Sequence, residues 1–155
     1  MVELIFASTQ LQYQAATVLF SGYAEWLGID LSFQNFSEEL RQVKSVYAPP
    51  CGCVILAKYT QVYAGCIAVK KLSKQIAEVK RMYVLPDVQQ KGIGKALLAK
   101  ALDFAREVGY EKVQLDTLAH MHPAINLYKQ TGFYEIPAYY YNPQPTALYF
   151  EKSLQ

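Results

Sequence analysis

The chain has 155 residues, a formal net charge of +2 and 52% hydrophobic residues, which predicts one globular domain, residues 1–155, with a substantial core. No dense basic block favours nucleic-acid binding, and no apolar run is long enough to predict a membrane span. The first residues, Met1 to Leu4, carry an acid and no basic region, so they do not predict a signal peptide.

The first third of the chain predicts a strand followed by two helices. Val2–Ala7 has the composition of a short strand. Thr9, with Gln12 three residues later, forms the capping-box pattern that begins a helix. Ser37 is the predicted cap of a second helix that continues to Val46, just before a pair of prolines.

Three strands are predicted next, over Cys53–Tyr59, Val62–Lys70 and Ile76–Leu85. Their connections are too short for crossover helices, so the strands are expected to form an antiparallel meander.

The second half of the chain alternates between helix and strand. Its predicted elements are a helix over Lys95–Val108, a strand over Lys112–Leu118, a helix from Pro123 to Gly132, and hairpin strands over Phe133–Tyr141 and Thr146–Leu154. Gly109 suits the residue that follows the C-terminus of the first of these helices. The whole order is β-α-α-β-β-β-α-β-α-β-β, which predicts an α/β fold: a mixed sheet with helices on both faces.

A glycine-rich segment joins the third strand of the meander to the helix over Lys95–Val108. Gly92 and Gly94 permit positive φ angles and a close approach of a ligand to the backbone, and the following helix start can bind an anion. The segment is not a P-loop, because Ala96 stands where Ser or Thr is required. Two alternatives stay open from these residues: a turn that binds no ligand, and a nicotinamide-binding oxidoreductase with Asp116 on the ribose.

Two longer motifs add to this pattern. Met82-Tyr83-Val84-Leu85-Pro86, the glycine segment and Lys95-Ala96-Leu97-Leu98 resemble motif A of the GCN5-related N-acetyltransferases, the GNAT family. Asn126-Leu127-Tyr128-Lys129-Gln130-Thr131-Gly132-Phe133 is similar to motif B of that family. The resemblance is most specific over residues 76–135 and departs from the family at Gln89-Gln90, where many members carry Arg-Gly. It implies the acyl-CoA N-acyltransferase fold and acetyl-CoA as cofactor.

The resemblance also implies where the cofactor lies. The pyrophosphate is expected at the backbone N–H groups from Gln90 to Lys95, and the pantetheine arm at the backbone edge of Met82–Val84. That edge is free only if the flanking strands splay, for which a bulge near Met82 or Tyr83 would be one cause. The predicted cofactor-binding residues are Met82, Tyr83, Val84, Gln89, Gln90, Lys91, Gly92, Ile93, Gly94, Lys95 and Asn126.

For catalysis, the resemblance assigns Tyr128 as the acid that protonates the departing thiolate, with a core tyrosine as the alternative. A backbone N–H near Val84 would stabilise the oxyanion. Glu78 is the first candidate for the base, because simple strand alternation places it on one face with Met82 and Val84. A surface acid paired with a lysine is the alternative for Glu78. His120 and His122 are further candidates for proton relay.

The expected reaction is direct transfer of an acetyl group to a primary amine of a small molecule or a protein. A non-catalytic CoA-binding sensor of the same fold is the alternative. The three cysteines lack metal-ligand spacing and predict reduced thiols in a cytoplasmic protein, with no metal site. A homodimer is compatible with the resemblance. The acceptor region is expected to draw on an acid and on aromatic and polar residues that could receive a cationic amine: Trp26, Asp30, Phe33, Phe36, Tyr47, Tyr139, Tyr140, Tyr141 and Asn142.

Overall fold

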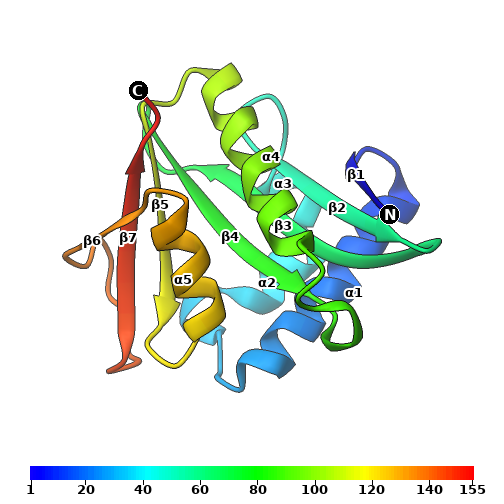
Figure 1. Cartoon of the computed structure of the whole chain (residues 1–155), viewed down its shortest axis with the longest axis horizontal. Coiled ribbons are helices and arrows are strands. Elements are labelled where there is room, and N and C mark those ends of the chain that lie inside the picture. The colour runs from blue at the N-terminus through cyan, green and yellow to red at the C-terminus, as the bar shows by residue number, and fades with distance from the viewer.

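A single mixed sheet runs through the computed structural model, which describes all residues, 1–155 (Figure 1). The strand order is β1-β2-β3-β4-β5-β7-β6, and every neighbouring pair is antiparallel except β4 and β5. The strands are β1 (Val2–Phe6), β2 (Cys53–Tyr59), β3 (Val62–Lys71), β4 (Ile76–Val84), β5 (Lys112–Leu118), β6 (Tyr134–Ile136) and β7 (Ala147–Ser153). The predicted α/β fold, meander and crossover are confirmed.

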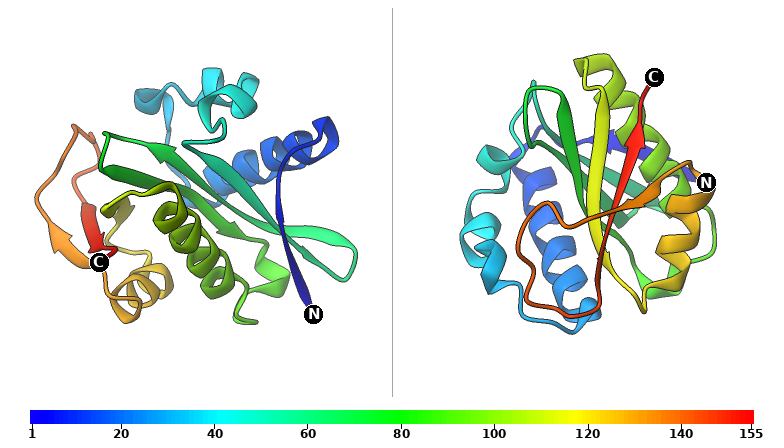
Figure 2. Two further views of the ribbon diagram at one scale, coloured as in Figure 1. Left: turned by 90° about the horizontal axis from the view of Figure 1, so that it is seen from above. Right: turned by 90° about the vertical axis from the view of Figure 1, so that its left-hand side faces the viewer.

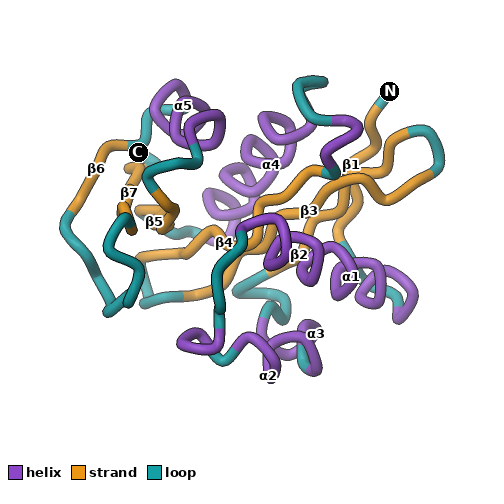
Figure 3. Tube along the Cα trace, turned by 90° about the horizontal axis from the view of Figure 1, so that it is seen from below, coloured by secondary structure: helices purple, strands orange, loops and turns teal.

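Helices cover both faces of this sheet (Figures 2 and 3). They are α1 (Gln10–Leu27), α2 (Phe36–Arg41), α3 (Val43–Val46), α4 (Ile93–Val108) and α5 (His122–Gln130), with 3₁₀ turns η1 (Ser32–Gln34) and η2 (Pro86–Val88). Buried residues of α1 and α3 form one core cluster with one face of the sheet, and buried residues of α4 and α5 form another with the opposite face. No helix combines the length and the apolar character needed to cross a membrane.

The start of α1 and the end of α4 lie where the local sequence predicted them. Thr9 accepts a hydrogen bond from the Gln12 backbone, and the Gln12 side chain accepts one from the Thr9 backbone, so the predicted capping box begins α1. Gly109 ends α4 in the left-handed region, at a φ of 102°. Both helices therefore begin or end where side-chain capping and glycine freedom predict.

The prediction of one continuous helix from Ser37 to Val46 is wrong. The segment begins at Asn35, which has a φ of 55°, and breaks at Gln42 into α2 and α3. The break has a physical reason in the core, where the Tyr47 hydroxyl donates to the Glu39 carboxylate at 2.9 Å. Eight residues of continuous helix would separate these two positions by about 12 Å along the axis, so a turn in the chain favours this bond.

The closing hairpin is also shorter than predicted. Its first strand ends at Ile136, and residues 137–146 form an irregular loop instead of continuing along β7. Pro137 cannot donate to a strand ladder, which favours an end at this point. The loop passes to the side of the sheet where α1 and α2 lie (Figure 2). There Gln34 donates to the Tyr140 hydroxyl at 2.9 Å.

Candidate active site

The two parallel strands in the centre of the sheet separate soon after they meet. β4 pairs with β5 only from Ile76 to Glu78; beyond that point β4 follows β3 and β5 follows β7. A cavity of about 490 Å³ lies at this gap. Its walls come from α1 and from the starts of α4 and α5, which lie on opposite faces of the sheet, so the cavity passes through the layer of strands.

A bulge in β4 accompanies the separation. Ala68 pairs with Lys80 and Cys66 with Tyr83, so Arg81 and Met82 together lie opposite the single residue between those partners. Arg81 has a φ of 61°, and its carbonyl accepts a hydrogen bond from the Cys66 thiol at 3.2 Å. The sequence predicted a bulge near Met82 or Tyr83, and the observed bulge, at Arg81 and Met82, confirms it.

The bulge overturns the predicted face of Glu78. Before it, Ala77 and Val79 belong to the core on the α4 side, and after it Met82 and Val84 pack against that same core. Glu78 therefore points to the opposite face, which α1 and α2 cover. Simple alternation failed because the bulge inserts one extra residue and exchanges the two faces.

Past the bulge, β4 presents a free backbone edge to the cavity. The Leu85 N–H donates to the Ala64 carbonyl of β3, and because successive residues alternate in direction, the Val84 N–H faces the gap. The Val84 carbonyl faces the gap as well and accepts a hydrogen bond from the Gln89 side chain at 3.0 Å. This edge can pair with an extended, amide-containing ligand arm.

The glycine segment forms the adjoining wall. Gln90 and Gly92 have φ angles of 65° and 81°, and α4 begins directly after them without a side-chain cap. The first backbone N–H groups of a helix have no partner within the helix and carry its positive dipole end, so this wall can bind a phosphate group.

The predicted cofactor residues gather at this cavity with two exceptions. The lining residues among them are Met82, Tyr83, Val84, Gln89, Gln90, Gly92, Ile93, Gly94 and Lys95. Lys91 and Asn126 are exposed and do not line it. Contact of Asn126 with a cofactor stays a prediction.

Tyr128 lies between the hydrophobic core and the cavity. Its ring packs against Phe133 and Phe150, and the residue is 6% exposed. Burial, and then the neighbouring Tyr23 and Asp116, raise the pKa of its hydroxyl above the ordinary value. The phenol is therefore held in its protonated form at neutral pH, which is the form that a general acid requires.

Of the other residues predicted for proton transfer, only His120 lines the cavity; Glu78 and His122 do not. Glu78 is buried, accepts a hydrogen bond from Tyr139 at 2.6 Å and lies 4.0 Å from the Lys80 ammonium, but it does not line the cavity. His120 lines the cavity and His122 does not. Asp116, which entered the sequence interpretation only as a ribose ligand, lines the cavity.

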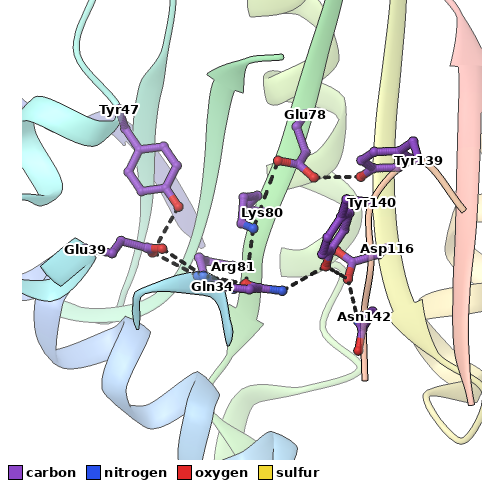
Figure 4. A network of polar contacts seen from close by, with 10 residues as sticks. All are labelled: Gln34, Glu39, Tyr47, Glu78, Lys80, Arg81, Asp116, Tyr139, Tyr140 and Asn142. Carbon is purple, nitrogen blue, oxygen red and sulfur yellow. Dashed lines mark hydrogen bonds and ion pairs between the residues drawn. The ribbon is translucent and has the colours of Figure 1, made fainter. Parts of the chain in front are cut away.

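A buried polar network borders the cavity on the α1 side and was not predicted (Figure 4). Arg81 donates to both Glu39 oxygens, at 2.8 and 2.9 Å, and to Gln34 at 2.8 Å. Lys80 donates to the same Gln34 oxygen at 3.2 Å. The available signal was the presence of Lys80 and Arg81, together with Glu78, in the middle of a strand whose other residues are mostly apolar, because buried charges need partners.

The residues predicted for the acceptor region are divided among the cavity, the core and the surface. Trp26 lines the cavity, while Tyr47 is part of the core and Tyr141 is exposed. Tyr140 and Asn142 both donate to Asp116. The final loop therefore contributes to this region through contacts with a lining carboxylate.

Fold and cavity together define an acyl-CoA N-acyltransferase. The sequence profile of the Acetyltransferase (GNAT) family matches residues 17–133, and the chain belongs to that family. Acetyl-CoA is the co-substrate of the family, and the uncapped start of α4 and the free edge of β4 fit its phosphates and its amide-containing arm.

Similar proteins agree with this assignment. An uncharacterized N-acetyltransferase of Schizosaccharomyces pombe is 35% identical over 134 residues, covering 85% of this chain and 82% of its own. An acetyltransferase of the GNAT family from Staphylococcus aureus has the same fold, with a TM-score of 0.81, 20% identity and full coverage of both chains. The PaiA N-acetyltransferase of Thermoplasma acidophilum, solved with coenzyme A, gives a TM-score of 0.75 at 17% identity over 99% of each chain.

Proposed function

We propose that this protein transfers the acetyl group of acetyl-CoA to a primary amine, with both substrates bound together in the cavity between β4 and β5. The observation that carries the proposal is the cavity itself, which joins the uncapped start of α4, a free strand edge and a buried phenol. Acetyl-CoA supplies the acetyl group as a thioester. The three free cysteines, two of them buried, favour a cytoplasmic setting.

In the proposed reaction each protein group has one task. The Val84 N–H donates to the carbonyl oxygen, where negative charge develops as the amine attacks. Tyr128 gives its proton to the sulfur as the carbon–sulfur bond breaks, and the nitrogen gives up a proton that restores the phenol through water. No acyl-enzyme is needed, because holding amine and thioester together supplies much of the rate.

Cofactor binding is tested by thermal unfolding with acetyl-CoA. At a concentration of 100 times Kd, binding adds about 2.7 kcal/mol to the free energy of unfolding. For a domain of this size we expect the melting temperature to rise by about 5–10 °C. No shift at millimolar acetyl-CoA, compared with NADH as the control ligand, would contradict the proposal.

Transfer itself is tested by mass spectrometry of acetylated products over a panel of amines. Product mass is preferable to a thiol reagent, because Cys51 is exposed and would react with the reagent. A protein that binds CoA and acetylates no amine would instead be the non-catalytic sensor.

Gly94→Ala is expected to weaken acetyl-CoA binding without lowering the stability of the fold. A Cβ at this position would have ordinary contacts, at 3.9 Å from Leu127 and 4.0 Å from Val84, and alanine favours helix over glycine by about 0.5–1 kcal/mol. The added methyl group would enter the cavity wall where the phosphate is placed. We expect urea unfolding to show unchanged or higher stability and calorimetry to show acetyl-CoA affinity about tenfold lower. Equal affinity would remove this wall from the phosphate site.

A further inference from the structure

Asp116 is a carboxylate of the cavity without a cationic partner. Both of its hydrogen bonds, from Tyr140 and Asn142, end on Oδ2, and Oδ1 accepts none. None of the ion pairs in the protein includes it. The side chain is half-buried, so water compensates its charge only in part.

The other charges in this part of the cavity are already compensated. Arg81 is paired with Glu39 at 2.8 Å, and Lys80 lies 4.0 Å from Glu78. Each of these cations has its ion-pair partner in another carboxylate, so neither forms an ion pair with Asp116. The charge of Asp116 does act on Lys80: burial and Arg81 lower the pKa of Lys80, and Glu78 and Asp116 oppose this in part. Lys95 also lines the cavity, but on α4, where the cofactor phosphates are expected.

Aromatic rings complete the surroundings of this carboxylate. Tyr23 and Trp26 of α1 line the cavity, and their rings pack against Tyr83 with centroids 6.3 and 5.6 Å apart. Tyr23 lies near Asp116, whose charge adds to the effect of burial in raising the pKa of that tyrosine. A cavity that holds a carboxylate together with tyrosine and tryptophan rings favours an organic cation. Asp116 lies near Tyr128 as well, since its charge contributes to the raised pKa of that phenol after burial and Tyr23.

We infer that Asp116 binds a small primary amine, the acceptor, as its ammonium ion, and that Tyr140 and Asn142 position the carboxylate for it. The ammonium ion gives one proton to water, and the neutral nitrogen then attacks the thioester. The inference rests on the proposed function and specifies the acceptor class. The cofactor arm shares the 490 Å³ of the cavity, which leaves space for a small molecule. A carboxylate on the carbon that carries the amine would lie beside the Asp116 carboxylate, so amines without this group are preferred over amino acids.

Glu78 is the competing anchor and is placed less well. Its side chain is 5% exposed and is held by Tyr139 and Lys80, and it faces away from the Met82 and Val84 side of the strand. An acceptor could reach it only by displacing those partners.

The test uses pairs of compounds that differ by one carboxylate. The probes are 2-phenylethylamine and phenylalanine, tyramine and tyrosine, histamine and histidine, and 1,5-diaminopentane and lysine, together with a short peptide that has a free N-terminus. For the wild-type protein we expect kcat/KM at least tenfold higher for the best amine than for its amino-acid counterpart or the peptide. Preferred acetylation of amino acids or of the peptide would overturn the inference and leave the proposed function intact.

The residue is tested with Asp116→Asn, which keeps the size of the side chain and removes its charge. We expect the KM for the best amine to rise about 10- to 100-fold, with the KM for acetyl-CoA within twofold of wild type. Asp103→Asn, an exposed acid on α4, is the matched control and should change neither constant. An unchanged amine KM in Asp116→Asn would overturn the inference.

A second variant keeps the test decisive if Asp116→Asn does not fold. Tyr140→Phe removes one hydrogen bond to the carboxylate and keeps its charge, so we expect a rise of about 3- to 10-fold in the amine KM. No rise would overturn the positioning role. If the wild-type protein binds acetyl-CoA and acetylates none of the probes, the proposed function itself fails.

Discussion

Replacing Tyr128 by phenylalanine is expected to lower kcat about 10- to 1,000-fold with little change in acetyl-CoA affinity. The ring packs against Phe133 and Phe150, so phenylalanine keeps the hydrophobic contacts and removes only the hydroxyl. That hydroxyl has no hydrogen-bond partner in the protein and lies at the cavity, with its pKa raised by burial. Without it, the sulfur leaves as a thiolate or takes its proton from water. Single-turnover kinetics with the best amine, together with calorimetry of acetyl-CoA binding, measure the two quantities separately.

Tyr110→Phe is the matched control for this experiment. The Tyr110 hydroxyl donates to the Cys51 carbonyl at 2.8 Å, away from the cavity. Its loss is expected to lower stability by about 1 kcal/mol without changing kcat. If Tyr128→Phe turned over as fast as Tyr110→Phe, Tyr128 would be a core residue and the acid would lie elsewhere.

The largest expected loss of stability comes from Glu39→Ala, at about 3–5 kcal/mol in the free energy of unfolding. Glu39 and Arg81 are 7% and 4% exposed, and the substitution would leave a buried guanidinium without a carboxylate, with Gln34 and the Tyr23 and Phe36 rings as its remaining contacts. Burial alone would raise the pKa of Glu39, but the hydrogen bonds and charge of Arg81 outweigh it and lower the pKa. The pair therefore stabilises fully above the ordinary carboxyl pKa, and its contribution is lost as pH falls through the lower folded-state value. Urea unfolding at pH 7 and at acidic pH measures both effects.

The neighbouring residue provides the control. Glu38 pairs with Arg41 on the surface, where both side chains are more than half exposed, so Glu38→Ala is expected to cost less than about 1 kcal/mol. Similar losses in the two variants would show that the buried pair adds nothing beyond a surface pair. We also expect Glu39→Ala to weaken acetyl-CoA binding, because Arg81 has a left-handed conformation at the bulge and would lose the carboxylate that binds its side chain.

Most of the fold could be predicted because its signals are local. The capping box at Thr9, the positive φ at Gly109 and the spacing of apolar residues each depend on neighbours in the chain. The glycine segment and Tyr128 could be placed for the same reason, since each belongs to a continuous motif.

The errors share a different cause, which is contact between residues far apart in sequence. The break at Gln42 allows Tyr47 to bond Glu39 beside Arg81, and the early end of β6 allows Tyr140 to reach Asp116. The face of Glu78 was wrong because β4 has a bulge at Arg81, a residue that bonds the Glu39 carboxylate of α2. No pattern within a short stretch of sequence reports such partners.

The bulge has a consequence for how the enzyme can diversify. It assigns Met82 and Val84 to one side of β4 and Lys80 and Arg81 to the other. In the proposed reaction, this strand therefore borders the site of the acetyl-CoA arm on one side and the region of the acceptor on the other. Substitutions that change specificity for the acceptor can accumulate on the Lys80 and Arg81 side. Binding of the acyl donor on the Met82 and Val84 side would be retained.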